Sequence, residues 1–199
     1  MNVELLLQTL NFISPMSAAL DRRFRETLKE EHRPKKYHLL REGEIANKIY
    51  FINNGFARAY YIQDDKECTS WFMSKGDLMI SVYSFYTQQP AAENIELLAD
   101  SELLSMSWSQ LQGIYADFPE YNFTGRLVTE KYYLLAEERA VLMRTLSAKK
   151  RYERLIQTHP DILRNASLGQ IASYLGISQE TLSRVRAAKP DLTLVKKKG

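Results

Sequence analysis

The chain has 199 residues, enough for one large domain or two small ones that each bury a core. Hydrophobic residues make up 45% of the chain, yet no run approaches the roughly 20 uninterrupted apolar residues that a membrane helix requires. Residues 1–10 contain Glu4 and polar residues where a secretory signal would be basic and apolar, so we expect a cytoplasmic protein. The single cysteine, Cys68, excludes an internal disulfide and the several thiolates of an iron–sulfur or zinc site.

Charge is divided unevenly along the chain. Residues 1–125 hold 12 Lys and Arg against 17 Asp and Glu, a net charge of −5, whereas residues 126–199 hold 15 against 7, a net charge of +8. This excess indicates a polyanionic partner for the C-terminal part. A basic tail that only keeps the protein soluble would give the same count.

Residues 2–31 are predicted to form two short helices around Ser14-Pro15, because apolar residues recur there at three- or four-residue spacing. From Lys35 the pattern changes to short aromatic or branched runs between turn residues, which is typical of strands. The predicted strands are Tyr37–Leu40, Ile49–Ile52, Phe56–Ile62, Glu67–Met73, Ile95–Ala99 and Glu102–Ser107.

Asn54-Gly55 predicts a tight hairpin between two of these strands, because both central residues of such a turn need positive φ. Further turns are predicted at Asp64-Asp65-Lys66, Lys75-Gly76-Asp77 and Asp100-Ser101. Strands spaced in this way predict a small antiparallel barrel or roll.

A helical pattern extends from Ser109 to about Leu146, with a break at Pro119. One stripe along it has the alternating steps of four and three that are typical of a coiled-coil seam. It comprises Tyr121, Gly125, Val128, Tyr132, Leu135, Arg139, Leu142 and Leu146. A second stripe, Leu127, Leu134 and Val141, borders it. We expect a parallel homodimer with Tyr121, Val128, Tyr132, Leu135 and Leu142 at its interface, although both stripes could also pack within one monomer.

The region after a basic helix, Ala148–Thr158, and a break at His159-Pro160 predicts a helix-turn-helix. Ser167 and Gln170 form a capping-box pattern, so a helix begins at Leu168 and buries Leu168, Ile171, Ala172 and Leu175. Gly176 permits a left-handed turn, and Ser178 caps a second helix over 179–188 that buries Leu182 and Val185.

The second helix carries the side chains that we expect to contact DNA in the major groove. Arg184 suits guanine, Glu180 suits cytosine and Gln179 suits adenine, whereas Thr181, Ser183 and Arg186 suit phosphate. Two such helices in a dimer predict a near-palindromic operator with half-sites about 34 Å apart.

The order of these elements resembles the CRP/FNR superfamily of regulators. Residues 49–58 are similar to its early β-roll hairpin, and Ser178–Arg184 is similar to its recognition helix, with Gln179 where the family typically has Arg. The resemblance implies an α+β fold with a jelly-roll-like antiparallel β-roll and flanking helices, a long dimerisation helix and a C-terminal helix-turn-helix. It divides the chain into residues 1–118, 119–146 and 147–199. It implies double-stranded DNA, a second copy of the chain and RNA polymerase as partners, and neither a cofactor nor a membrane.

The sequence departs from the family at the phosphate-binding cassette, a Gly-Glu turn followed by an arginine. Gly76-Asp77 matches the turn, but residues 76–125 contain no Lys or Arg and seven acids. We therefore expect that cyclic AMP does not bind. Tyr83, Phe85 and Tyr86 are candidates for contacting another effector, although aromatic residues of this kind more often pack in the core.

Two alternatives remain open. A cupin-like metalloenzyme or small-molecule-binding protein would share a β-roll, but His32, His38 and His159 are scattered, so the sequence predicts neither catalytic residues nor metal ligands. The other alternative is a cyclic-nucleotide-responsive regulator in which Arg58 or Arg126 reaches the pocket from outside the cassette.

Overall fold

The computed structural model describes residues 2–187 of the chain. The chain divides into two units, residues 1–140 and residues 141–199. The boundary lies within the longest helix, α5 (Tyr121–Thr145). Ala188 and the basic residues Lys196, Lys197 and Lys198 lie outside the described residues.

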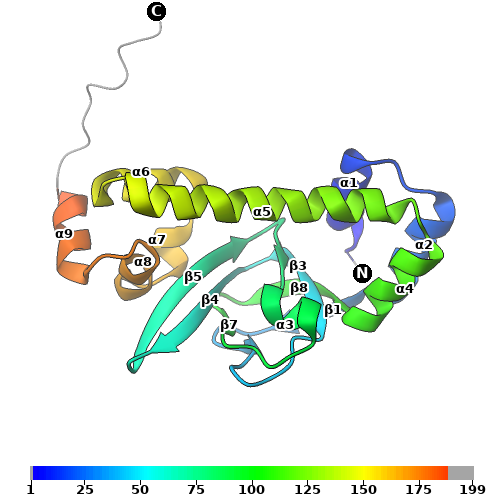
Figure 1. Cartoon of the computed structure of the whole chain (residues 1–199), viewed down its shortest axis with the longest axis horizontal. Helices are drawn as coiled ribbons and strands as arrows, with labels where there is room; N and C mark the ends of the chain where they lie inside the picture. The colour runs from blue at the N-terminus through cyan, green and yellow to red at the C-terminus, as the bar shows by residue number, and fades with distance from the viewer. Residues whose placement is uncertain (1, 188–199) are drawn as a thin grey trace, which may run out of the picture. The chain divides into compact units, whose positions relative to one another are not determined.

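Two four-stranded antiparallel sheets form the β-roll of the first unit (Figure 1). The first sheet has the order β1 (Lys29–Arg33), β8 (Ser101–Ser107), β3 (Lys48–Asn54), β6 (Leu78–Met79). The second has the order β2 (His38–Leu40), β7 (Asn94–Leu97), β4 (Phe56–Gln63), β5 (Lys66–Ser74). The predicted roll is confirmed.

Helices cover the first sheet, which explains why its strand β8 is buried on both faces. Consecutive residues Leu103 and Leu104 of β8 are both fully buried, as expected for a strand between two packed layers. Helix α1 (Glu4–Ile13) packs against β3, α4 (Trp108–Asp117) packs against β8, and α2 (Ala18–Thr27) packs against α4. A short helix, α3 (Val82–Thr87), follows β6.

The N-terminal segment becomes extended earlier than predicted. The helical pattern was expected to reach Glu31, but α2 ends at Thr27 and β1 begins at Lys29. Sequence reasoning missed this strand because charged residues have low strand propensity. Hydrogen bonds across the sheet offset the low strand propensity of Glu31, which accepts from Ser105 (2.6 Å) and Lys48 (2.9 Å). Burial would raise the pKa of Glu31, but these donors and Arg33 lower it to about 2.

Asn54-Gly55 is not a hairpin turn, so that prediction is wrong. β3 ends in the first sheet and β4 begins in the second, and of the two residues only Gly55 has positive φ (+127°). A Cβ at Gly55 would lie 2.6 Å from the Cβ of Ser101 and 3.0 Å from its Cα, so the passage between sheets needs glycine. The tight turn from β4 to β5 is made by Asp64 (φ 49°) and Asp65 (φ 58°).

The second unit is helical in its described part. It contains the end of α5, then α6 (Ala148–Thr158), α7 (Ile162–Asn165), α8 (Leu168–Tyr174) and α9 (Gln179–Ala187). The bounds of α6 agree with the prediction. Arg151 donates to the backbone carbonyls of Met143 (3.2 Å) and Leu146 (2.9 Å), which satisfies acceptors at the end of α5.

Replacing Gly55 with alanine should lower the free energy of unfolding of the first unit by about 3 kcal/mol. Part of this cost, about 1–2 kcal/mol, comes from positive φ, and the rest comes from the collision with Ser101. Gly43→Ala is the matched control, because Gly43 also has positive φ (+85°) but nothing lies within 4 Å of its added Cβ. Urea denaturation followed by circular dichroism measures both variants, and equal losses would contradict the steric argument.

Candidate nucleic-acid interface

A capping box fixes the start of α8. The Ser167 hydroxyl accepts from the backbone N–H of Gln170 (3.2 Å), and the Gln170 side chain accepts from the backbone N–H of Ser167 (2.9 Å). Both bonds were predicted, and together they satisfy two N–H groups that a helix start leaves unpaired. Helix α8 therefore begins at Leu168, and its buried face carries Ile171 and Ala172.

The chain turns sharply between α8 and α9 at Gly176. Its φ of +63° is the left-handed conformation that the sequence predicted. The Ile177 N–H donates to the carbonyl of Ala172 (3.1 Å), which closes the turn. Ser178 then caps α9 by accepting from the backbone N–H of Thr181 (3.2 Å). The turn and the cap therefore fix the direction of α9 relative to α8.

The apolar side of α9 is anchored and its polar side is exposed. Leu182 is fully buried and packs in a helical unit with buried Ile171 and Leu175. The prediction that Leu168 is buried is wrong, since this residue is 43% exposed in the first turn of α8. The exposed polar residues of α9 are Gln179, Glu180, Ser183, Arg184 and Arg186, and Thr181 is half-buried. The predicted DNA-contacting side chains are thus brought together on one short helix.

Local hydrogen bonds orient two of these side chains. The Ser178 hydroxyl and the backbone N–H of Glu180 both donate to the Glu180 carboxylate, which lowers its pKa. Glu180 is therefore an anionic acceptor at neutral pH. Arg184 donates to the Thr181 hydroxyl (3.2 Å), so its guanidinium lies beside the first turn of α9. An acceptor and a donor group are presented to solvent one helical turn apart.

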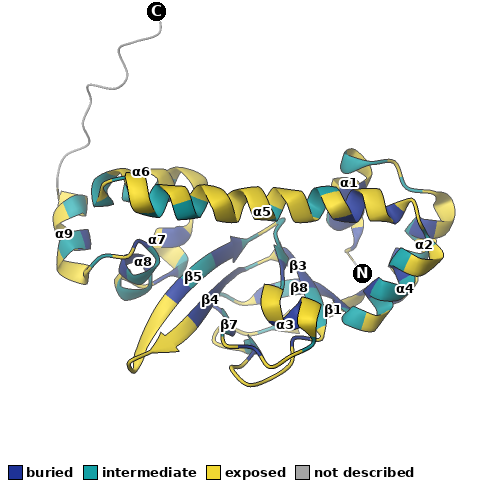
Figure 2. Cartoon of the chain, in the orientation of Figure 1, coloured by how far each residue is buried: buried dark blue, intermediate teal, exposed yellow. Residues whose placement is uncertain are grey.

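Helix α5 is buried in parts of its first turns and exposed along its middle (Figure 2). Tyr121 is 7% exposed and packs on Phe24 with ring centroids 5.1 Å apart. Val128 packs against the same core, and the Tyr132 hydroxyl accepts from the backbone N–H of Leu78 (2.7 Å). The first half of the first predicted stripe therefore packs within its own unit. Leu142, in the second unit, is half-buried.

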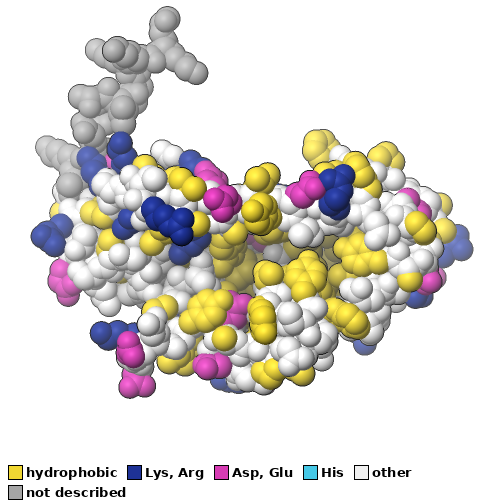
Figure 3. Space-filling model, viewed as in Figure 1, with side chains coloured by type: hydrophobic (Ala, Val, Ile, Leu, Met, Phe, Trp, Pro, Cys, Tyr) yellow, Lys and Arg dark blue, Asp and Glu magenta, His cyan; other side chains and the backbone are white. Residues whose placement is uncertain are grey.

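The second stripe lies on the open side of α5. Leu134 of this stripe is 64% exposed, and Leu135, which belongs to the first stripe, is 37% exposed. With Leu127 they line a shallow groove between charged side chains. Figure 3 shows hydrophobic side chains over the middle of α5 between charged ones. We call Leu127, Leu134 and Leu135 the α5 apolar stripe. Sequence reasoning recognised both stripes but could not tell which one its own domain would cover.

The loop that corresponds to the phosphate-binding cassette does not fit a phosphodiester. Asp77 accepts from the backbone N–H of Ser74 (2.8 Å) and so stabilises its own turn. The carboxyl group of Glu93 accepts from the hydroxyls of Ser81 and Tyr61, and burial raises its pKa in spite of these two donors. Hydroxyls that could bind an anion are thus already used by an internal carboxyl group. Glu93 is one of the seven acidic residues in 76–125, but no pattern in the sequence indicates that it is buried.

Neither arginine proposed as a substitute faces the interior of the roll. Arg58 alternates along β4 with Ala57 and Ala59 of the hydrophobic core, so it lies on the opposite face of the sheet. There it pairs with Glu96 (2.9 Å) and Glu67. Arg126 is 54% exposed and pairs with Glu130 on α5.

The three aromatic candidates of α3 separate into two groups. Phe85 is fully buried, and Tyr86 joins it in lining a pocket. Tyr83 is 66% exposed and does not line this pocket.

Two further observations concern other classes of protein. Within residues 2–187, no group of three or more His, Cys, Asp and Glu side chains could hold a metal ion. His32 lies in β1, His38 contacts the Tyr60 hydroxyl (3.2 Å), and His159 follows α6. None of the helices in this described range is long and apolar enough to span a bilayer.

Comparison with known proteins matches part of the chain to a domain family and finds a similar fold over most of the chain. Residues 30–118 match the cyclic nucleotide-binding domain. No curated protein matches the sequence.

Three solved structures illustrate the similarity in fold. CLP, a c-di-GMP-responsive global regulator of Xanthomonas campestris, is 18% identical with a TM-score of 0.64, over 86% of this chain and 90% of CLP. FixK2 of Bradyrhizobium japonicum is 19% identical with a TM-score of 0.69, over 80% and 83%. A putative CRP/FNR-family transcriptional regulator of Eubacterium rectale is 16% identical with a TM-score of 0.65, over 85% and 82%.

Proposed function

We propose that this chain is a homodimeric, sequence-specific DNA-binding transcription regulator of the CRP/FNR type, because residues 30–118 match the cyclic nucleotide-binding domain and the fold is similar to that of solved regulators. The observation that carries the proposal is the exposed polar side of α9, which follows a left-handed turn at Gly176 and presents Gln179, Glu180 and Arg184. A helical hairpin with only a structural role would need the buried Ile171 and Leu182 but not these exposed groups.

The proposed contacts follow from the chemistry of base edges in the major groove. Arg184 donates two hydrogen bonds to guanine O6 and N7, and Glu180 accepts from cytosine N4. Gln179 pairs with adenine N6 and N7. Thr181, Ser183 and Arg186 contact phosphate, which positions α9 without distinguishing sequences. The charge of +8 on residues 126–199 supports this role, because duplex DNA is a polyanion.

Dimerisation is proposed through the α5 apolar stripe. Leu127 and Leu134 are seven residues apart, so they lie on one side of the helix and can meet the same residues of a second copy in a parallel pair. Lys131 and Glu138 also line the groove, so charged side chains would lie at the edge of the apolar contact. The buried position of Tyr121 and the hydrogen-bonded position of Tyr132 favour this stripe over the one first assigned to the interface.

The remaining parts of the proposal concern location, chemistry and effectors. A transcription regulator acts in the cytoplasm, where RNA polymerase is a further partner, and it catalyses no reaction. We propose that cyclic AMP is not its effector, because the cassette loop offers Glu93 where a phosphodiester needs positive charge.

Arg184→Ala should weaken binding to the preferred duplex by about 1–3 kcal/mol and relax the preference at one base pair. Arg186→Ala is the matched control, since loss of a phosphate contact weakens all duplexes alike and reduces the slope of log K against log salt by about 1. Fluorescence anisotropy on a panel of single-base-pair variants measures both. Equal losses on every duplex for Arg184→Ala would contradict base recognition by this side chain.

Leu134→Glu should convert the dimer into a monomer, because a carboxylate in an apolar helix pair is desolvated without a partner. Sedimentation equilibrium measures the change in mass. Phe12→Glu provides the control, since Phe12 is a 93% exposed residue of α1 outside the α5 apolar stripe. A Leu134→Glu variant that stays dimeric would rule out the proposed interface.

Isothermal titration calorimetry with cyclic AMP should show no binding at micromolar concentrations, since burying a phosphodiester beside Glu93 lacks compensating charge. A dissociation constant in the micromolar range or tighter would contradict the interpretation of the cassette loop.

A further inference from the structure

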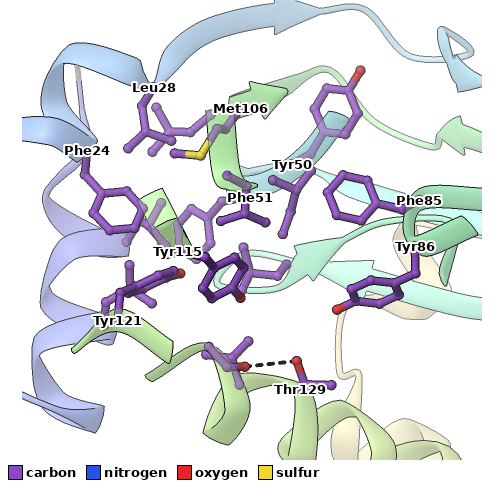
Figure 4. A pocket seen from close by; sticks show the side chains of 18 residues that line it. Phe24, Leu28, Tyr50, Phe51, Phe85, Tyr86, Met106, Tyr115, Tyr121 and Thr129 are labelled. Atoms are coloured by element: carbon purple, nitrogen blue, oxygen red, sulfur yellow. Dashed lines mark hydrogen bonds between the residues drawn. The ribbon is translucent and has the colours of Figure 1, made fainter. Parts of the chain in front are cut away.

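A small cavity lies in the first unit where its helices meet the first sheet. Its volume is about 60 Å³. Elements from distant parts of the sequence contribute to it: α1 and α2, strands β3 and β8, then α3, α4 and the start of α5. Among the described residues that line it, none is charged. The wall is mainly apolar, and its aromatic members are Phe24, Phe51, Phe85 and four tyrosines (Figure 4).

Three tyrosines bring polar groups to this apolar space. Tyr86 comes from α3, Tyr115 from α4 and Tyr121 from α5, and Figure 4 shows the Tyr86 hydroxyl directed toward the side of Tyr115 and Tyr121. Tyr121 is 93% buried, and its hydroxyl has no hydrogen-bond partner within residues 2–187. Burial and the neighbouring Tyr115 and Tyr86 raise the pKa of Tyr121, so the hydroxyl stays protonated.

The Tyr121 hydroxyl oxygen is not itself fully buried, so it is accessible to a molecule in the cavity that it lines. The packing around it is close. A Cβ at Gly125 would lie 2.6 Å from Cε1 of Tyr115, so glycine is needed there to admit the Tyr115 ring. Gly125 therefore lets Tyr115 of α4 pack on the first turns of α5 beside Tyr121.

The size and lining of the cavity limit what can occupy it. An apolar cavity of about 150 Å³ binds benzene, so the 60 Å³ here admits a molecule of about three non-hydrogen atoms. An ion is excluded because no charged side chain among the lining residues would compensate for its desolvation. A hydrogen-bond acceptor is favoured because the Tyr121 hydroxyl lacks one.

We propose that this cavity is a ligand site for a small neutral molecule with an apolar body and one hydrogen-bond acceptor, of the nitrile, aldehyde or ketone class, bound by the Tyr121 hydroxyl. The site is separate from the cassette loop, since Ser81, Glu93 and Tyr61 do not line it. It concerns the first unit alone, so its failure would leave the proposed DNA-binding function standing.

Acetonitrile is the probe, because it has three non-hydrogen atoms and accepts but does not donate hydrogen bonds. Titration into the full chain, followed by NMR of the tyrosine side chains, should give saturable shifts of Tyr115 and Tyr121. Tyr121→Phe keeps the ring and removes the donor, so it should weaken acetonitrile binding about fivefold. Tyr83→Phe is the matched control, because Tyr83 is an exposed tyrosine of α3 that does not line the cavity, and its affinity should not change.

Xenon tests whether the cavity can be filled without a hydrogen bond to the Tyr121 hydroxyl. It fills apolar space without hydrogen bonding, so Tyr121→Phe should bind xenon as the unaltered chain does, whereas Leu111→Phe should exclude both probes by filling the space. Equal acetonitrile affinity in Tyr121→Phe and the unaltered chain would overturn the proposal. Shifts that do not saturate, or that are as large at Tyr83, would overturn it as well.

Discussion

The left-handed backbone at Gly176 is the constraint on which the exposed surface of α9, our proposed DNA contact, depends. With φ at +63°, the chain reverses after α8, and the Ser178 cap starts α9 at once. A Cβ at this position would also lie 2.7 Å from Cε of Met143, so the turn is closely packed. Because Leu182 then fits against Ile171, the opposite side of α9 has to face solvent, and that side carries Glu180 and Arg184.

The first unit has the fold of a cyclic nucleotide-binding domain, but its cassette loop differs in chemistry from a phosphate-binding site. Its two sheets keep the arrangement of a cyclic nucleotide-binding domain, which the family match over residues 30–118 also indicates. The hydrogen-bonding groups of its cassette loop are nevertheless paired within the protein. Asp77 accepts from the backbone N–H of its own turn, and Glu93 accepts from the Ser81 and Tyr61 hydroxyls. The aromatic cavity beside α5 lies elsewhere, among Tyr86, Tyr115 and Tyr121. Any effector of this chain would therefore be recognised by packing and hydroxyl donors and not by charge.

Sequence patterns predicted what depends on neighbouring residues and failed where distant ones decide. The capping box at Ser167, the turn at Gly176 and the bounds of α6 are local, and the structure confirms them. The Asn54-Gly55 hairpin failed because sheet pairing, set by Ser101 and the core, overrides local turn preference. The strand at Glu31 depends on Lys48 and Ser105, which no local pattern connects to it. The sequence could not predict the exposed stripe of α5, because α2 and the first sheet decide which stripe is buried. The proposed base contacts remain predictions.

Selection of bound fragments from random duplex DNA by the full chain is the most direct measurement of the central claim. The account predicts an enriched near-palindrome whose half-sites lie about one helical turn, about 34 Å, apart, because two α9 helices related by a two-fold axis would contact successive major grooves. Recovery of no preferred sequence, or of a single unrepeated site bound by one copy of the chain, would contradict it.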